Sequence, residues 1–282
     1  MKYLNLDPEF TPFGEGIKFE SFVFKGGEPH IKITEDLTPE DEVMITCRAA
    51  SFEAFGTMLL AADALRRFDV NRMELFIPYF PAARQDRVMV PGEPLSVKVY
   101  ADMVNAMGFD KIWVFDAHSE VTPALLEDCQ VIPNHSFVKK VLSNFDLSDV
   151  VLVSPDGGAL KKIFKLSLAL GGVPVVEASK KRDVKTGKLS SFHVYEDSLE
   201  GKICFVVDDI CDGGGTFLGL GEQLLNKGAK ELNIIVSHGI FSKGVDHLKE
   251  MYANIYSTDS FSTMNNPGLN QIRLDKETTQ II

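Results

Sequence analysis

A hydrophobic run at positions 203–207, ICFVV, is followed within nine residues by three aspartates, three glycines and a threonine. Glycines let the backbone approach a ligand closely and adopt positive φ angles. The free N–H groups at the start of a following helix favour an anion such as a phosphate. Adjacent carboxylates are costly unless hydroxyls, cations or water satisfy them. The pattern therefore predicts a sugar-phosphate site formed by Asp208, Asp209, Asp212, Gly213, Gly214, Gly215 and Thr216.

Two common nucleotide-binding loops do not fit this stretch. In a dinucleotide-binding loop the glycines directly follow the strand and the ribose-binding acid comes much later, whereas here two acids precede the glycines. The sequence contains no GxxxxGK[ST] motif, which excludes a Walker A loop. A solvated turn with a glycine-rich helix cap remains as the alternative.

Chemically active residues also follow three other predicted strands. In open parallel sheets, ligands bind beyond the carboxyl ends of the strands. The stretches YFPAARQDR, DAHSE and SPDGGA would lie there, with Arg84, Gln85, Asp86, Asp116, His118 and Asp156. A basic segment, KKRDVKTGKLSS, follows a further strand; its alternative interpretation is an exposed hairpin.

Apolar strands that alternate with amphipathic helices must position these residues, which predicts an α/β fold with mainly parallel sheets. Strands are expected near 17–24 and 28–33, joined as a hairpin, and at 42–46, 73–80, 111–118, 149–154, 173–179, 203–209 and 231–239. Helices are expected near 52–68, from Pro94 to before Gly108, and near 135–144, 158–171 and up to 227. A boundary near 130–135 predicts two similar domains, residues 1–132 and 133–282.

Composition restricts the class of protein. The chain has 282 residues and a net charge of -11, which argues against a general nucleic-acid or anionic-membrane surface. Its four cysteines form no CxxC pair, which favours a reducing compartment over a disulfide framework. No signal-like or membrane-spanning apolar run is present, so a cytoplasmic protein is expected.

The motifs together resemble those of the ribose-phosphate pyrophosphokinase (PRPP synthetase) family. VVDDICDGGGT is similar to the PRPP loop of the type I phosphoribosyltransferase fold, and IPYFPAARQDR, FDAHSE, LVSPDGGALKK and SHGIFS are similar to other family stretches in the same order. The resemblance implies two phosphoribosyltransferase-like domains, each with a mainly parallel sheet flanked by helices. It also implies transfer of the β,γ-diphosphoryl group of ATP to the anomeric hydroxyl of ribose 5-phosphate, with Mg2+ as cofactor and a homo-oligomer, dimer or hexamer, as the assembly.

The resemblance further implies a role for each matching residue. Lys180 and Arg182 would stabilise the transferring diphosphoryl group, and the loop from Asp208 to Thr216 would hold ribose 5-phosphate. His118 and Asp156 would contact metal. ATP would be held by Phe24, Glu28, Arg84, Gln85 and Asp86.

Three positions depart from the family pattern. Gly26 stands where an aspartate is expected beside Phe24 and Glu28, Gly213 replaces a threonine of the PRPP loop, and Gly92 replaces an arginine of the regulatory loop. These changes bear on adenine selectivity, on the strength of phosphate binding and on regulation by phosphate and ADP. Two other functions stay open: a non-catalytic PRPP-synthetase-like subunit, and a phosphoribosyltransferase, which would lack ARQD and DAH.

Overall fold

The computed structural model describes residues 1–182 and 189–281, and for residues 181, 182, 189 and 190 it describes the backbone alone. The chain forms two compact units. The first unit comprises residues 1–133, 260–263 and 274–282, and the second comprises 134–259 and 264–273.

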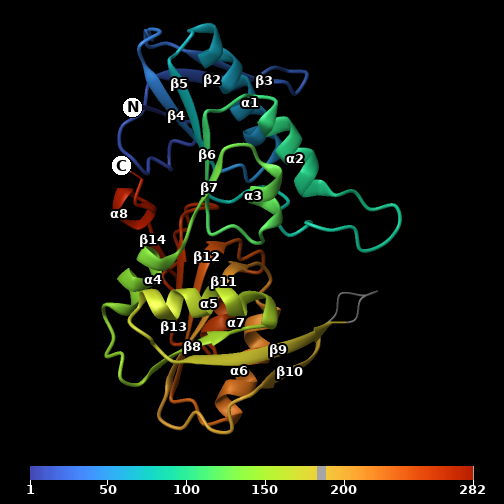
Figure 1. Cartoon of the computed structure of the whole chain (residues 1–282), viewed down its shortest axis with the longest axis vertical. Helices are drawn as coiled ribbons and strands as arrows, with labels where there is room; N and C mark the ends of the chain where they lie inside the picture. Colours follow the sequence, from blue (N-terminus) through green and yellow to red (C-terminus); the bar gives the residue numbers. More distant parts are fainter. Residues whose placement is uncertain (183–188, 282) are drawn as a thin grey trace. The chain divides into compact units, whose positions relative to one another are not determined.

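The first unit is built on a parallel sheet with the spatial order β1-β4-β5-β6-β7. An antiparallel hairpin, β2–β3, lies apart from this sheet and packs on α1. Figure 1 shows these elements in blue to green. Their bounds are β1 (Lys2–Asn5), β2 (Phe19–Val23), β3 (Pro29–Ile33), β4 (Glu42–Thr46), β5 (Arg72–Phe76), β6 (Lys111–Phe115) and β7 (Cys129–Ile132).

Helix α1 (Phe52–Arg67) shows how the first unit forms its core. The Ser51 hydroxyl accepts a hydrogen bond of 3.1 Å from the Ala54 N–H and caps the helix. Its buried face has the spacing of one helical stripe, with Phe55, Met58, Ala61, Ala62 and Leu65 in the core. The unit also contains α2 (Ser96–Asn105), α3 (Val121–Leu125) and α8 (Lys276–Thr279).

The second unit is built on a sheet with the order β10-β9-β8-β11-β12-β13-β14. All neighbouring pairs are parallel except β10 and β9. Helix α5 packs against β8 and β9, whereas α6 packs against β10 and β12. The bounds are α4 (His135–Leu142), β8 (Val150–Ser154), α5 (Gly157–Ala169), β9 (Val175–Arg182), β10 (Leu189–Val194), β11 (Ile203–Cys211), α6 (Gly215–Asn226), β12 (Glu231–Gly239), α7 (Asp246–Lys249), β13 (Asn254–Thr258) and β14 (Asn270–Ile272).

The predicted α/β class with mainly parallel sheets is confirmed, and several element ends differ from the prediction. Strand β9 continues to Arg182, because β10 pairs with it where the sequence indicated a basic loop. Helix α2 begins at Ser96 instead of Pro94, with Leu95 at the N-cap position. The C-terminal residues 274–282, which the sequence assigned to the second domain, lie with the first unit.

Two observations concern the chain as a whole. All four cysteines are free thiols, with Cys47, Cys204 and Cys211 buried. None of the described helices is both long and apolar enough to cross a lipid bilayer.

Candidate active site

The acidic stretch lies on the part of β11 that extends beyond its neighbour β8. Strand β11 pairs with β8 only as far as Val206. On its other side it continues along β12 until Cys211 pairs with Gly239. Asp208 and Asp209 therefore lie at the carboxyl edge of the sheet, where β8 no longer pairs with β11. Parallel sheets bind ligands at this edge.

Asp208 and Asp209 form a repulsive pair. The Asp209 N–H donates a 3.0 Å hydrogen bond to Oδ1 of Asp208. Burial raises the pKa of Asp208 well above its usual range, and the charge of Asp209 raises it further, while Lys180 acts in the opposite direction. A cation or a set of hydroxyl donors at this position would relieve the repulsion.

The glycine loop that follows requires glycine at one position and tolerates a side chain at another. Gly214 has a φ of 75°, and a Cβ there would lie 2.7 Å from Nε2 of His247. At Gly213 a Cβ would make only ordinary contacts, 3.6 Å from Cε of Lys243 and 3.9 Å from the Ser242 hydroxyl. Gly215 begins α6, so the free amides at the helix start belong to this loop.

Asp156 and Lys180 face each other across the ends of β8 and β9. Oδ1 of Asp156 accepts hydrogen bonds from the Gly158 N–H (2.8 Å) and the Ala159 N–H (3.1 Å), and so caps α5. Oδ2 accepts from Nζ of Lys180 at 2.6 Å. Burial alone would raise the pKa of Asp156, but the Lys180 hydrogen bond and charge and the two amides outweigh burial and lower it.

The other predicted catalytic residue, Arg182, ends β9, and its side chain lies outside the part of the chain that the structure describes. The same holds for residues 183–188 of the basic segment. Its start, at Lys180, does lie within the site: Lys180 is near enough to Asp208 to influence its ionisation.

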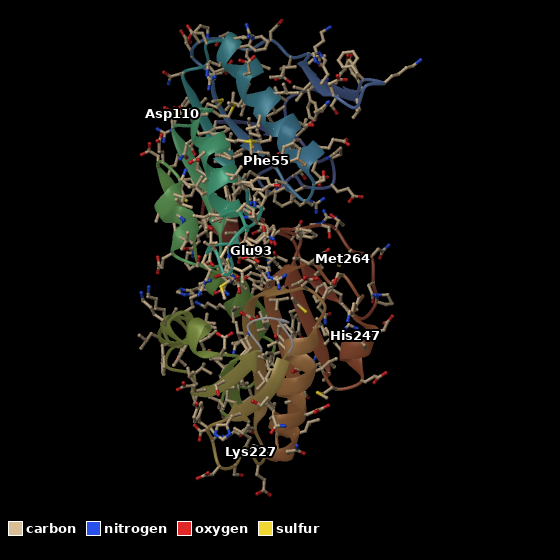
Figure 2. All side chains as sticks on the ribbon, turned by 90° about the vertical axis from the view of Figure 1, so that its right-hand side faces the viewer. Phe55, Glu93, Asp110, Lys227, His247 and Met264 are labelled. Carbon is tan, nitrogen blue, oxygen red and sulfur yellow. The ribbon has the colours of Figure 1, made fainter. Side chains whose placement is uncertain are left out.

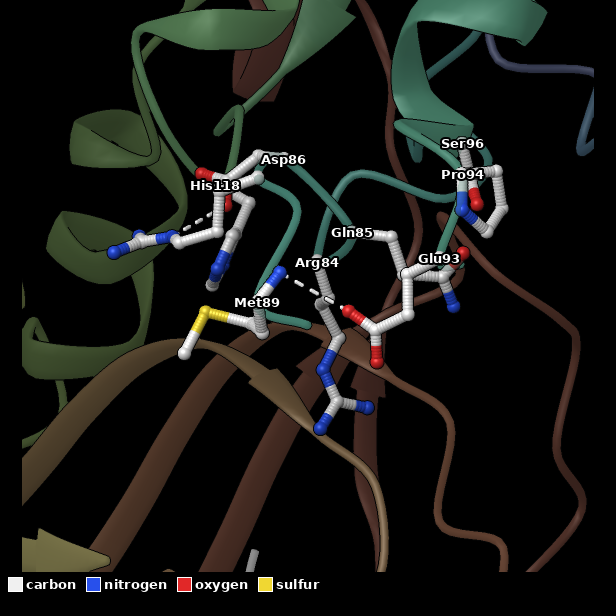
Figure 3. A pocket seen from close by; sticks show the side chains of 9 residues that line it. Arg84, Gln85, Asp86, Met89, Glu93, Pro94, Ser96 and His118 are labelled. Carbon is white, nitrogen blue, oxygen red and sulfur yellow. Dashed lines mark hydrogen bonds and ion pairs between the residues drawn. The ribbon is translucent and has the colours of Figure 1, made fainter. Parts of the chain in front are cut away.

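The first unit holds a cavity of about 480 Å³ beside the ends of β5 and β6. Figure 3 shows how the loop after β5 and the loop after β6 supply its walls. Three of the predicted ATP-binding residues meet here with the predicted metal ligand His118. The lining residues are Arg84, Gln85, Asp86, Arg87, Met89, Glu93, Pro94, Ser96 and His118.

Two carboxylates of this cavity have different tasks. Glu93 accepts hydrogen bonds from the Met89 N–H (3.0 Å) and the Val90 N–H (3.2 Å) and braces the loop. Burial favours a higher pKa for Asp86, but hydrogen bonds from Ser119 and Arg87 and the charges of Arg87 and His118 outweigh it, so the pKa falls. Asp86 therefore stays ionised beside His118.

Phe24 and Glu28 lie on the exposed turn of the β2–β3 hairpin, and Phe24 is 51% exposed. The Glu28 carboxylate folds back over Gly26: a Cβ at Gly26 would lie 2.5 Å from Oε2 of Glu28. The carboxylate of Glu28 thus occupies the space that the side chain of an aspartate at position 26 would enter.

Sequence reasoning and the structure agree in part on which residues meet. Arg84, Gln85, Asp86 and His118 line one cavity, and Asp156, Lys180, Asp208 and Asp209 interact electrostatically at one sheet edge. Among the described residues, no group of three or more His, Cys, Asp or Glu side chains has the arrangement of a metal site. Glu93, Lys243 and His247 were not predicted, since only the fold brings them to these loops; Lys243 directly follows the SHGIFS stretch.

Comparisons with known proteins agree with this architecture. Residues 15–108 match the family model described as the N-terminal domain of ribose phosphate pyrophosphokinase, and residues 133–271 match the phosphoribosyl transferase domain. The ribose-phosphate pyrophosphokinase of Agrobacterium fabrum is 31% identical over 230 residues, which cover 78% of this chain and 71% of that protein. The one of Vibrio parahaemolyticus is 31% identical over 258 residues, 85% of this chain and 77% of that protein.

Among solved structures, the phosphoribosylpyrophosphate synthetase of Mycobacterium smegmatis has the same fold. It superposes with a TM-score of 0.82 and 24% identity over 97% of this chain and 95% of that one. The predicted pair of phosphoribosyltransferase-like domains is thereby confirmed as the fold class. The relatives, the matched domains and the shared fold show that this chain belongs to the ribose-phosphate pyrophosphokinase family.

Proposed function

We propose that this protein is a ribose-phosphate diphosphokinase that converts ATP and ribose 5-phosphate to PRPP and AMP. In this reaction the anomeric oxygen of ribose 5-phosphate bonds to the β-phosphorus of ATP. The bond between that phosphorus and the oxygen bridging it to the α-phosphorus breaks, AMP leaves, and the hydroxyl proton is released. The observation that carries the proposal is the match of both halves of the chain to this family, together with Lys180 held at the acidic sheet edge.

The second unit would bind ribose 5-phosphate. The amides at the start of α6, with Gly213, Gly214, Gly215 and Thr216, would hold the 5-phosphate. Asp208 and Asp209, with Asp212 nearby in the loop, would accept hydrogen bonds from the sugar hydroxyls. This role fits the mutual repulsion of Asp208 and Asp209, since hydroxyl donors stabilise the ionised pair.

Lys180 would stabilise the transferring group. Its ammonium is now paired with Asp156, and the side chain is only 16% exposed, so it is held close to the site. An incoming diphosphoryl group, more highly charged than one carboxylate, would compete with Asp156 for this ammonium. Arg182 would bind oxygens of the same group, which is the kind of electrostatic stabilisation on which phosphoryl transfer depends.

A magnesium ion fits the donor chemistry of the second unit. Mg2+ prefers oxygen ligands and is usually held by one or two carboxylates together with substrate phosphates and water. The Asp208–Asp209 pair, whose charges repel, offers such oxygens. Asp156, which accepts hydrogen bonds from two α5 amides and pairs with Lys180, offers further carboxylate oxygens beside it. When bound with ATP, the ion would neutralise charge on the diphosphoryl group. His118, in the cavity of the first unit, would contact the metal ion that is bound with ATP.

The first unit would bind ATP. Arg84 and Gln85 are exposed at the cavity and offer a guanidinium and an amide, and the ionised Asp86 balances Arg87 and His118. The exposed hairpin residues Phe24 and Glu28 would contribute to adenine binding. Exposed apolar side chains on the hairpin and on α1, Phe22 (48%), Phe24 (51%) and Phe52 (67%), support assembly as a homo-oligomer, a dimer or hexamer. No nucleic-acid or membrane partner is proposed.

One assay tests the reaction. Purified protein is incubated with ATP, Mg2+ and ribose 5-phosphate, and AMP and PRPP are quantified. Stoichiometric formation of both supports the proposal, and omission of Mg2+ should abolish it. AMP and PRPP at background level would overturn it in favour of a non-catalytic subunit, whereas release of pyrophosphate from supplied PRPP and a base would indicate a phosphoribosyltransferase.

A further inference from the structure

The phosphate loop carries a marked deficit of positive charge. From residue 208 to 216 it contains three aspartates and no lysine, arginine or histidine. A phosphate monoester carries between 1.5 and 2 negative charges near pH 7. Helix amides offset part of this charge, and Lys180 acts on Asp208, but the loop itself supplies no basic side chain for the anion.

The segment after β12 brings a lysine to this loop. The Ile240 and Phe241 N–H groups both donate to the Cys211 carbonyl, at 2.9 and 3.0 Å, and so fix the segment beside the loop. Two residues later, Cδ and Cε of Lys243 lie 3.7 and 3.6 Å from the place of a Cβ at Gly213. The end of the lysine side chain thus lies on the side of the loop from which the family's threonine would project.

Lys243 is also available for a ligand. Its side chain is exposed, and it forms no ion pair with any residue that the structure describes. The next lysine, Lys249, differs: its Nζ is 3.1 Å from Oδ1 of Asp246. Nε2 of His247 is buried near Gly214 and has no hydrogen-bond partner among the described residues, and a side chain at position 214 would collide with it. Figure 2 shows His247 near the start of α6 and Lys227 at its other end.

We propose that Lys243 binds the 5-phosphate of the sugar substrate and takes over the role of the hydroxyl that Gly213 lacks. This inference rests on the proposed function, because it assigns a further binding residue to the same substrate. A glycine at 213 leaves room for the ammonium of Lys243 to approach the phosphate. A charge-assisted hydrogen bond from this ammonium replaces a neutral one from a hydroxyl and is the stronger of the two.

The test compares Lys243→Ala, Lys243→Arg and the control Lys230→Ala with the unchanged protein. Lys230 is exposed and precedes β12, at the opposite end of the strand, so its variant removes the same charge away from the loop. Lys243→Ala should raise both the KM and the calorimetric Kd for ribose 5-phosphate about tenfold. The KM for ATP and the Tm should not change, and Lys243→Arg should restore most of the affinity.

A second pair of variants tests the exchange of roles. Gly213→Thr in the Lys243→Ala background should recover several-fold of the lost affinity, whereas Gly213→Ala, which adds Cβ without a hydroxyl, should recover none. If the effects of Lys243→Ala and Gly213→Thr on the binding free energy of ribose 5-phosphate were strictly additive, the two positions would not share a role.

The outcomes separate this inference from the proposed function. Unchanged ribose 5-phosphate affinity in Lys243→Ala would overturn the inference even if the protein makes PRPP. Binding that weakens in Lys243→Ala, in a protein that forms no AMP, would support the inference and overturn the proposed catalysis. If Lys243→Ala lowered the Tm and weakened the binding of ATP and ribose 5-phosphate equally, Lys243 would have a structural role, and this would also overturn the inference.

Discussion

Asp156 illustrates how one carboxylate can be assigned two roles. The resemblance to the family implies a metal contact for Asp156, and in the structure both of its oxygens accept hydrogen bonds, from the α5 amides and from Lys180. Asp is a favoured N-cap residue for a helix. Its placement is therefore explained by the fold alone, and its pairing with Lys180 is the feature that connects it with catalysis.

Replacement of Lys180 by alanine should lower turnover by at least 100-fold, the size of effect seen when a positioned charge-stabilising donor is lost. The KM for ribose 5-phosphate should change less than about threefold, since the sugar would be held by the β11–α6 loop. The measurement is steady-state AMP release. Lys202→Ala is the control, because Lys202 is a half-buried lysine at the other end of the sheet, where its Nζ lies 4.0 Å from Oδ1 of Asp149. Equal turnover in both variants would remove Lys180 from the mechanism.

Replacement of Asp208 by asparagine should stabilise the protein while it reduces activity. The folded-state pKa of Asp208 is raised by burial and by Asp209, so ionisation of Asp208 opposes folding, and stability is lost as pH rises above about 3.9, its unfolded value. Asparagine can still accept from the Asp209 N–H. The Tm at pH 8 should rise by about 2–4 °C, for roughly 1 kcal/mol.

The pH dependence provides the control for this variant. The Tm difference between Asp208→Asn and the unchanged protein should shrink as the pH falls toward the unfolded pKa of about 3.9 and below it, because Asp208 is then protonated in the folded chain and increasingly protonated in the unfolded chain. A stability gain that is the same at pH 4 and pH 8 would show that repulsion with Asp209 is not its cause. Catalytic activity should fall in the same variant, because a sugar hydroxyl or cation loses a carboxylate partner.

At the scale of elements, the sequence predicted the central strands well and the strands at or near the sheet edges poorly. β4, β8, β11 and β12 each contain a run of apolar residues that is buried on both faces, and such runs can be recognised from the sequence. β10 has the mixed sequence LSSFHV and is a strand because β9 pairs with it. β13 and β14 were missed for the same reason, since tertiary pairing overrides weak local patterns.

The candidate active site likewise has features that the sequence predicted and features that it did not. The acids, glycines and basic residues at strand ends could be recognised because their types and order are specific. Their mutual contacts could not: Lys180 meets Asp156 only because β9 extends past its predicted end, and Lys243 meets Gly213 only because the Cys211 carbonyl fixes residues 240 and 241. Contacts between segments separated in sequence depend on the fold and leave no local signal.

Helix α6 supports the β9–β10 hairpin through one close contact. A Cβ on Gly219 would lie 2.1 Å from Cε2 of Phe192, so an added methyl group must displace the ring and with it β10. Gly219→Ala should destabilise the protein by about 1–2 kcal/mol, because overpacking costs more than the gain in helix propensity. Turnover should also fall, since the same hairpin carries Lys180.

Gly56 provides the matched control for this prediction. It is also inside a helix, α1, but the nearest atom to its Cβ would be Cγ of Pro29 at 3.6 Å, an ordinary contact. Gly56→Ala should therefore stabilise the protein by up to about 1 kcal/mol. Thermal unfolding of both variants measures the difference, and Phe192→Ala combined with Gly219→Ala should remove most of the strain. Two variants of equal stability would contradict the role of the Phe192 contact.

At the scale of the whole molecule, the chain does not divide at one point. After the second unit is nearly complete, the last residues return to the first unit. There Leu274 is 2% exposed and Ile281 is 7% exposed, and Asp275 and Thr278 form a capping box at α8. A boundary read from sequence alone cannot show this return, because the tail is short and carries no motif.

The returning tail should therefore control the stability of the first unit. Leu274→Ala should cost about 2–4 kcal/mol through a buried cavity, whereas Leu168→Ala, at a side chain that is 78% exposed on α5, should change stability by less than about 0.5 kcal/mol. Hydrogen exchange locates the effect: amides of β1 and β4 should exchange faster in Leu274→Ala, while those of β8 and β11 keep their protection. Equal acceleration in both sheets would mean that the two units unfold together, and no change in β1 and β4 would mean that the tail does not support the first unit.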